Sequence, residues 1–275
     1  MGDGALRFAY ETFLGKSLSG LLFNTSGLSR LMGWFYDSPL SRKRINDLAA
    51  IPGCCPDEAE QPPEAYKSFN DFFTRRLKQG ARPFDPAPEQ LSSPADGRIL
   101  VYEDLAPSDA IPVKGARRTL NDLCCETLPA ASLAVAVIRL APVDYHRFHY
   151  PCACIQKEFP VKVKGKYHSV NPVALKVRPD LYVENTRQIT TLESDLFGSF
   201  RYLEVGAFGV GSIIQYTGPG AHDKLAEKGC FKFGGSTVIL IFDNAKLKWS
   251  SDLLQNSAAG HETLIRLGET VAAAR

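Results

Sequence analysis

The feature that most constrains this chain is a Gly-Gly-Ser-Thr step that leads directly into a run of apolar residues. Residues 238–242 read Val-Ile-Leu-Ile-Phe and end at Asp243, a pattern that predicts a short buried strand. Gly234 and Gly235 precede this run and allow backbone angles that other residues resist, so the chain can bend sharply there. Ser236 is therefore expected where a turn meets a rigid strand. Taken alone, the stretch fits a hairpin turn that enters a core strand.

The N-terminal part of the chain has helical periodicity, and the rest reads as short strands. Apolar residues repeat at helical spacing within residues 5–50. From Leu91 onward, short apolar runs are separated by Gly, Pro and Asp. Strands are predicted at 98–102, 133–140, 159–167, 188–192, 200–205, 211–216, 238–242 and 246–249, with short helices at 119–124 and near 252. The predicted fold class is therefore α+β, with N-terminal helices followed by a β-rich domain.

The two predicted parts are joined by a stretch rich in proline and acidic residues. Residues 51–66 read as a linker or surface loop. Ser68 and Asp71 then form a variant of the capping box, with Asp71 in the usual Glu position, and this predicts the start of a helix. Gly80 and Pro83 are expected to end that helix.

Charge and cysteine spacing argue against several classes of protein. The net charge of +2 and the pI near 8.1 are too close to balance to indicate a nucleic-acid partner. The seven cysteines are odd in number and include no CxxC, so neither a disulfide framework nor a zinc site is expected, and they read as reduced thiols in a cytosolic compartment. No apolar run approaches the roughly 18 to 20 residues of a membrane span, and the first residues lack the features of a secretory signal. The protein is expected to be soluble or to rest on a surface.

The N-terminal helices have two readings that stay open at this point. Trp34, Phe35 and Tyr36 adjoin the cations of residues 42–44, and aromatic residues beside cations are typical of an interfacial membrane contact. Amphipathic helices, however, mostly pack their apolar face onto a core. The sequence supports both readings about equally.

Candidate chemical groups lie on three separate segments. His146 and His149 fall in a segment bracketed by prolines, close to Asp144 and Arg147, and such a group can hold charge and move protons near neutral pH. No third ligand with suitable spacing supports a metal site, so no metal is predicted. Asp96 lies in a turn before Gly97 and would ordinarily serve only that turn. An Asp, a His and a Ser are nevertheless the components of a nucleophilic triad, although sequence order does not say whether they meet.

Six segments occur in a characteristic order between residues 69 and 237, and the resemblance that they carry runs from about residue 30 to the end of the chain. They are FNDFFTRRLK at 69–78, GARP at 80–83, SPADG at 93–97, DYHRFH at 144–149, YHSVNP at 167–172 and FKFGGST at 231–237. Together they resemble phosphatidylserine decarboxylases, a family of self-processing, pyruvoyl-dependent enzymes. The Gly-Gly-Ser-Thr form is similar to the branch of the family that carries it in place of Leu-Gly-Ser-Thr.

The resemblance implies that the chain is a proenzyme that cuts its own Gly235–Ser236 bond. Asp96 and His149 would activate Ser236, whose Oγ attacks the Gly235 carbonyl and converts the amide into an ester. β-Elimination would then release residues 1–235 as the β chain. The dehydroalanine left at residue 236 would hydrolyse, with loss of ammonia, to a pyruvoyl group at the start of the α chain, 236–275.

The resemblance also implies the reaction, its covalent pyruvoyl cofactor and the partners. The pyruvoyl ketone would form a Schiff base with phosphatidylserine and accept the electrons released with carbon dioxide, giving phosphatidylethanolamine. His146 is the implied proton donor. The α and β chains would form a heterodimer, with a dimer of heterodimers as an open alternative, on the cytoplasmic side of the cell membrane as a peripheral protein. Residues 1–50 would form an amphipathic region and 51–275 the catalytic domain.

Three other functions remain compatible with these residues. A soluble pyruvoyl-dependent decarboxylase of an amino acid such as tryptophan could use the same scaffold, although the amphipathic N-terminus favours a lipid substrate. A serine hydrolase could use Asp96, His149 and Ser236 for turnover, but the chain lacks a Gly-x-Ser-x-Gly elbow. A lipid-binding relative that never cuts itself is the third. An intact mass distinguishes cut from uncut chains.

Overall fold

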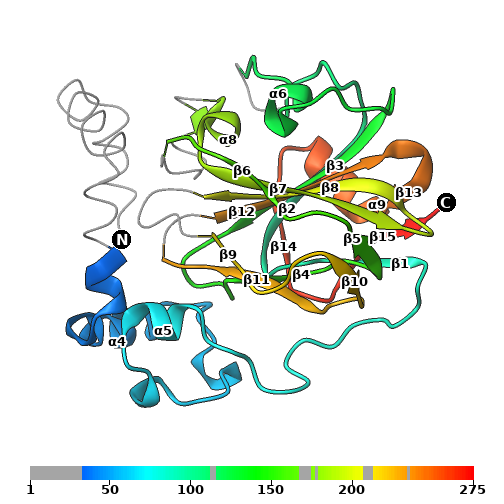
Figure 1. The fold of residues 1–275 in the computed structure, drawn as a ribbon. Helices are drawn as coiled ribbons and strands as arrows, with labels where there is room; N and C mark the ends of the chain where they lie inside the picture. The colour runs from blue at the N-terminus through cyan, green and yellow to red at the C-terminus, as the bar shows by residue number, and fades with distance from the viewer. Residues whose placement is uncertain (1–32, 112–115, 167–174, 177–178, 207–212, 234–235) are drawn as a thin grey trace.

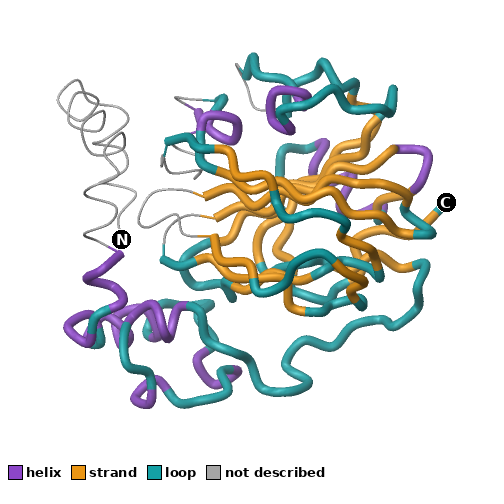
Figure 2. The backbone as a smooth tube through the Cα atoms, in the orientation of Figure 1, coloured by secondary structure: helices purple, strands orange, loops and turns teal. Residues whose placement is uncertain are grey.

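The computed structural model describes residues 33–111, 116–166, 175–176, 179–206, 213–233 and 236–275. The predicted helices within residues 5–32 therefore lie outside the described residues. Figure 1 shows a small helical part at the lower left and a larger body of strands, which confirms the predicted α+β class. A long segment made mostly of loop joins the two parts, from α5 to β1 (Figure 2).

The helical part is held together by its own apolar cluster. Its buried members come from both α4 and α5 and include Ile45, Leu48, Phe69, Phe72 and Phe73. The cluster thus spans residue 50, where the sequence places a domain boundary, and that boundary stays a prediction. The elements of this part are a helix at 33–37, η1 (Pro39–Ser41), α4 (Lys43–Ala49), η2 (Pro56–Glu58), η3 (Pro63–Ala65) and α5 (Phe69–Phe73).

The cap of α5 forms close to the way the sequence predicts. Ser68 is the N-cap, and its Oγ accepts a hydrogen bond from the backbone N–H of Asp71 at 3.2 Å. The carboxylate of Asp71 accepts in turn from the backbone N–H of Lys67 at 2.9 Å, one residue earlier than in a standard capping box. Two N–H groups at the start of the helix are thereby satisfied.

The end of α5 was predicted wrongly. The helix stops at Phe73 instead of continuing to Gly80. The reason is tertiary, because residues 76–78 turn to pair with residues 58–60. The backbone N–H of Glu60 donates to Arg76 at 2.9 Å, and that of Lys78 donates to the Glu58 carbonyl at 2.9 Å. These bonds replace the helical bonds that the local sequence would favour.

The body of the protein is built on one large antiparallel sheet. Among the described residues it has nine strands in the order β10-β5-β7-β8-β12-β3-β2-β14, with β6 also paired to β7. Most of the predicted strands belong to it, although β6 is shorter than the predicted 159–167. The strands are β2 (Gly97–Leu105), β3 (Leu133–Leu140), β5 (Cys154–Gln156), β6 (Val161–Val163), β7 (Arg187–Ser194), β8 (Gly198–Gly206), β10 (Gly220–His222), β12 (Ser236–Asp243) and β14 (Thr263–Ile265).

Two three-stranded sheets complete the strand content of the described residues. One has the order β1-β15-β13 and the other the order β4-β11-β9. Their strands are β1 (Gln90–Ser92), β15 (Thr270–Ala274), β13 (Leu247–Trp249), β4 (Arg147–His149), β11 (Glu227–Phe231) and β9 (Ile213–Gln215). The remaining helices are α6 (Leu120–Cys124), α8 (Leu181–Glu184), η4 (Asn244–Lys246) and α9 (Ser251–Ala258). The predicted helix at 119–124 is α6, with Thr119 as its N-cap.

The central strand β12 explains why its sequence is an unbroken apolar run. Val238, Leu240 and Phe242 belong to one buried cluster, which also contains residues of both small sheets. Ile239 and Ile241 face a second cluster, which is covered by α6 and α8. The strand is thus buried on both faces, and such strands have no polar alternation. The predicted buried strand is confirmed.

Candidate functional site

Ser236 lies where the chain passes from one sheet into another. It is the first residue of β12 and pairs with Leu140 on β3 and with Gly206 on β8. The preceding strand, β11, ends at Phe231 and belongs to a small sheet, whereas β12 belongs to the large sheet (Figure 1). Ser236 is fully buried, and its Oγ has no hydrogen-bond partner among the described residues. Gly235 lies outside the described residues.

Asp96 occupies the turn before β2 and is held by three hydrogen bonds. Arg82 donates from Nε to Oδ1 at 2.9 Å and from Nη2 to Oδ2 at 2.6 Å. The backbone N–H of Leu267 adds a third bond to Oδ1 at 2.8 Å. The next residue is a glycine because the chain passes close to β3 at this point. A Cβ on Gly97 would lie 2.8 Å from the carbonyl oxygen of Arg139. The Asp-Gly turn thus places a buried, charge-paired carboxylate at this end of the sheet.

His149 lies at the end of β4, next to the Asp96 turn. Its backbone N–H donates to the carbonyl of Pro94 at 2.9 Å. Its imidazole is buried, and Nδ1 has no hydrogen-bond partner among the described residues. Burial and the charge of Arg147 lower the pKa of His149 to about 4, against the opposing effect of Asp96. The ring is therefore neutral near pH 7 and can accept a proton.

Asp96 and Ser236 lie at one end of the large sheet, and His149, on β4 of a small sheet, is bonded through its backbone to Pro94 in the turn of Asp96. Arg98 of β2 pairs with Arg139 of β3, and the next residue of β3, Leu140, pairs with Ser236. Two strand spacings, about 10 Å, therefore separate the start of β2 from Ser236. Within the part of the chain that the structure describes, no hydrogen bond joins the side chains of Asp96, His149 and Ser236. The fold brings the three elements together without closing a hydrogen-bonded triad.

His146 is buried between the helical part and the strands. Its ring packs on that of Phe73, with centroids 3.9 Å apart, and its backbone carbonyl accepts from the N–H of Phe231 at 2.9 Å. Nδ1 lies 2.9 Å from the carbonyl oxygen of Asp144, which can only accept, so Nδ1 carries the proton and Nε2 has a free lone pair. Burial chiefly, with a contribution from Arg75, lowers the pKa of His146 to about 3. Like His149, it is neutral near pH 7.

Four buried polar atoms of this region have no partner among the described residues. They are Oγ of Ser236, Oγ1 of Thr237, Nδ1 of His149 and Nε2 of His146. Buried side-chain polar atoms are hydrogen-bonded in the large majority of cases, so such a concentration calls for a functional explanation. The set contains two hydroxyls and two neutral imidazoles, which are groups that suit nucleophilic attack and proton transfer. The described residues contain no group of three or more His, Cys, Asp or Glu side chains placed to hold a metal ion.

A polar cleft of about 620 Å³ opens between the helical part and the strands, and Arg147, the residue after His146, borders it. It is bordered by more cationic than anionic side chains. The cations are Lys67, Arg75, Arg76, Arg147 and Lys232, and the carboxylates are Asp37, Glu60 and Asp71. Arg75 and Arg82 are not among the site residues that the sequence predicts, although both lie in segments that carry the family resemblance. Their burial and partners are set by the tertiary structure.

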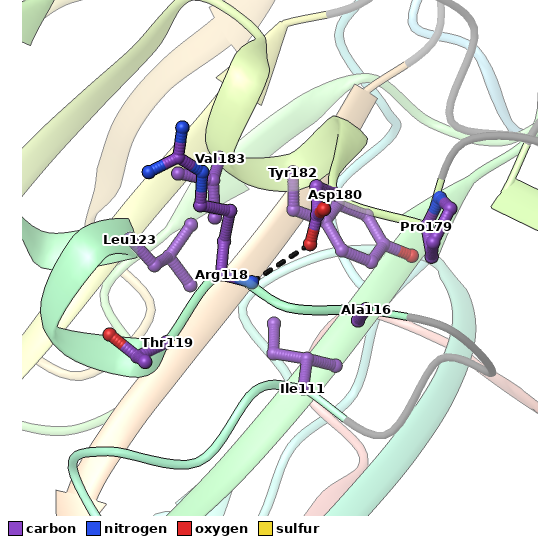
Figure 3. A pocket seen from close by; sticks show the side chains of 9 residues that line it. All are labelled: Ile111, Ala116, Arg118, Thr119, Leu123, Pro179, Asp180, Tyr182 and Val183. Carbon is purple, nitrogen blue, oxygen red and sulfur yellow. Dashed lines mark hydrogen bonds between the residues drawn. The ribbon is translucent and has the colours of Figure 1, made fainter.

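A second, much smaller hollow lies between α6 and α8 and is unrelated to these residues. Figure 3 shows Asp180 on its rim, where the carboxylate accepts hydrogen bonds from the backbone N–H groups of Arg117 and Arg118 at 2.8 and 2.9 Å. Neither histidine nor Ser236 or Asp96 borders it. The two hydrogen bonds to Asp180 join the segment before α6 to the segment before α8.

The comparisons with known proteins agree over almost the whole chain. The family model described as phosphatidylserine decarboxylase matches residues 69–273. A phosphatidylserine decarboxylase proenzyme of Ruminiclostridium cellulolyticum is 40% identical, over 98% of this chain and 91% of the relative. Proenzymes with the same name from Chlamydia muridarum and Desulfitobacterium hafniense are 40% and 38% identical, over 97% and 98% of this chain and 90% and 92% of the relatives.

Proposed function

Since the chain belongs to the phosphatidylserine decarboxylase family, we propose that it cuts its own Gly235–Ser236 bond and then converts phosphatidylserine into phosphatidylethanolamine. Family membership confirms the predictions of a carboxy-lyase and of a proenzyme. The roles of individual residues are our proposal. The observation that carries them is the buried Oγ of Ser236 at the start of β12, which has no hydrogen-bond partner among the described residues and lies at the same end of the large sheet as Asp96.

In the proposed self-cleavage, Ser236 is the nucleophile and His149 the base. His149 is neutral and buried, so it can take the Oγ proton as the oxygen attacks the Gly235 carbonyl. The C–N bond to residue 236 breaks, the nitrogen takes up a proton, and an ester replaces the amide. β-Elimination then breaks the Cβ–Oγ bond and leaves residue 235 with the new carboxylate.

Asp96 would support His149 electrostatically. Its negative charge favours the imidazolium that forms when His149 takes the proton, and this is the direction in which Asp96 acts on the pKa of His149. The two bonds from Arg82 fix the carboxylate. Because these bonds already occupy both oxygens, we propose that Asp96 acts by its position and charge.

The two chains left by cleavage would stay together through strand pairing. β12, at the start of the α chain, pairs with β3 on one side and β8 on the other. β14 pairs with β2, and β15 pairs with β1. Separating the chains would therefore break pairing in two sheets and expose the buried face residues of β12. This supports a heterodimer of α and β chains; its further dimerisation remains a prediction.

The residues present suit a pyruvoyl group at position 236. Ser236 supplies the atoms, and its buried Oγ has no hydrogen-bond partner among the described residues that the conversion would disrupt. When formed, the group would serve as the electron sink for loss of the carboxylate. His146 would take a proton at Nε2 and deliver it to the substrate carbon. Its pKa is low in the absence of substrate, and an anionic group bound nearby would raise it.

Contact with a membrane surface is proposed for the N-terminal side of the helical part. Trp34 is 66% exposed and Leu40 is 72% exposed. The exposed side chains of residues 42–44 add three cations beside them. Exposed apolar groups next to cations suit an anionic lipid surface. None of the helices in the described residues is long and apolar enough to cross a bilayer.

One experiment tests the two halves of the proposal. The intact mass of the purified protein should show two chains cut before residue 236, with the second chain carrying the mass change from serine to pyruvoyl. The same preparation should release carbon dioxide from phosphatidylserine in mixed micelles. Release from tryptophan or serine, with none from phosphatidylserine, would instead identify a soluble amino-acid decarboxylase.

A further inference from the structure

Arg75 is a buried cation that forms no ion pair with any described residue. It follows α5 by two residues and is only 3% exposed. Its guanidinium donates no hydrogen bond to any residue that the structure describes, and both Nε and Nη1 are buried and unpaired. The ring of Phe72 lies 5.0 Å from the guanidinium carbon, which is a weaker form of compensation than an ion pair.

Arg187 shows how the same fold treats an arginine that serves structure alone. It is also 3% exposed, but its guanidinium donates to the carbonyl of Leu123 at 2.7 Å and to that of Asp122 at 3.0 Å. Arginine is rarely buried without such partners, because an uncompensated buried charge is costly. The difference leaves the guanidinium of Arg75 able to bind an anion from outside the described residues.

The carboxylates that border the same cleft are bonded to other groups or are exposed to solvent. Asp37 pairs with Lys232 at 2.8 Å, and Asp71 accepts from the backbone of Lys67 at 2.9 Å. Glu60 is exposed. Arg147, the other partly buried cation of the cleft, pairs with Glu227. Lys67 and Arg76 are exposed to solvent, so among the buried and partly buried cations of the cleft Arg75 is the one left to bind an anion.

The position of Arg75 places such an anion next to the proposed chemistry. Phe73, two residues earlier, packs on the ring of His146. The positive charge of Arg75 also acts on that imidazole. The cleft continues to Lys232, on the segment that leads to Ser236.

We propose that Arg75 binds the anionic oxygens of the substrate headgroup, the carboxylate or the phosphodiester, and holds that group beside His146. This inference rests on the proposed function, since it assigns the headgroup contact of the same site. A guanidinium suits both groups, because it is planar, permanently charged and presents N–H donors in a fixed arrangement.

The test compares Arg75→Gln with Lys78→Gln, an exposed cation three residues away that does not border the cleft. Intact mass shows first whether each variant cuts itself, which also reports folding. For Arg75→Gln, KM for phosphatidylserine in mixed micelles should rise about tenfold, because a hydrogen bond to a charged group is lost. The kcat should change much less, and Lys78→Gln should match the wild type in both constants.

A competitor identifies which anionic group Arg75 binds. Glycerophosphoethanolamine has the phosphodiester but no carboxylate. Inhibition that weakens in Arg75→Gln by the factor seen in KM assigns the phosphodiester, and unchanged inhibition alongside a raised KM assigns the carboxylate. Both results support the inference.

The inference and the proposed function fail in different ways. A wild-type KM in Arg75→Gln, with normal self-cleavage, would overturn the role of Arg75 while the decarboxylase assignment stands. If the glutamine variant does not cut itself, Arg75→Lys takes its place, because it keeps the charge but lacks the planar fork; an unchanged KM there is equally decisive. A wild-type protein that neither cuts itself nor acts on phosphatidylserine would remove both.

Discussion

The guanidinium of Arg82 holds the carboxylate of Asp96 with two parallel hydrogen bonds, at 2.9 Å and 2.6 Å. Both side chains are about nine-tenths buried, so this pair is shielded from solvent. The pair therefore fixes the charge of Asp96 in its turn. In the same turn, the carbonyl of Pro94 accepts a hydrogen bond from the backbone N–H of His149. Arg82 is thereby a positioning residue for the proposed self-cleavage.

Replacing Arg82 should damage both stability and self-cleavage. Arg82→Ala leaves Asp96 buried without its cation, which should cost about 3 kcal/mol of unfolding free energy. Cleavage should slow at least tenfold, because a carboxylate of Asp96 that is no longer held in place favours the imidazolium of His149 less. Urea unfolding and the fraction of cut chain over time measure the two effects. Arg266→Ala, which removes an exposed partner of Glu58, is the control and should change neither by much.

Ser236→Ala should give one uncut chain without a pyruvoyl group. The chain should fold about as well as other uncut variants, within about 1 kcal/mol, because the Oγ that is removed has no hydrogen bond among the described residues. Intact mass checks cleavage, and urea unfolding beside uncut His149→Gln checks stability. Two fragments from Ser236→Ala would contradict the assigned cleavage site.

The two histidines should separate the two reactions. His149→Ala should block self-cleavage, since no other assigned group takes the Oγ proton. His146→Ala should still cut itself, yet release carbon dioxide from phosphatidylserine at least tenfold more slowly, because the proton donor is missing. Mass spectrometry and carbon dioxide release on the same samples separate these effects. Wild-type turnover in His146→Ala would show that another group protonates the product.

The pH dependence of self-cleavage should reflect the lowered pKa of His149. The base acts only when neutral, and burial with the charge of Arg147 lowers its pKa to about 4. The rate should therefore stay constant as pH falls through the ordinary histidine value of 6.5, and decrease only as pH approaches 4. Precursor made by cell-free synthesis and transferred to buffers of different pH allows the measurement. A midpoint near 6.5 would mean that the acting base is not the buried imidazole.

A fully buried ion pair between Lys228 and Glu204 offers a test of the fold itself. Their charged atoms are 2.6 Å apart. Lys228→Met should lower the unfolding free energy by about 3 to 5 kcal/mol, because Glu204 is left charged and unpaired. Adding Glu204→Gln should recover part of this loss. Lys157→Met, which breaks an exposed pair with Glu193, should cost about 1 kcal/mol or less.

Local patterns predicted the elements that their own apolar pattern or a nearby capping residue specifies. The apolar run after Ser236 specifies a strand buried on both faces, and it became β12. Thr119 and Ser68 cap α6 and α5 through side chains three residues from their partners. The order of six segments was enough to predict the family, and through it the cleavage bond and the residues proposed to act there.

The tertiary structure alone decided what depends on contacts distant in sequence. The helix α5 ends early because residues 76–78 bond to residues 58–60. The strand β4 went unpredicted because it has three residues and depends on β11, some eighty positions later, for its pairing. A run of two arginines in the sequence does not say that Arg75 is buried and forms no ion pair with any described residue. Sequence spacing sets which residues can form a helix or strand, but burial and charge pairing follow from packing, which only the folded chain specifies.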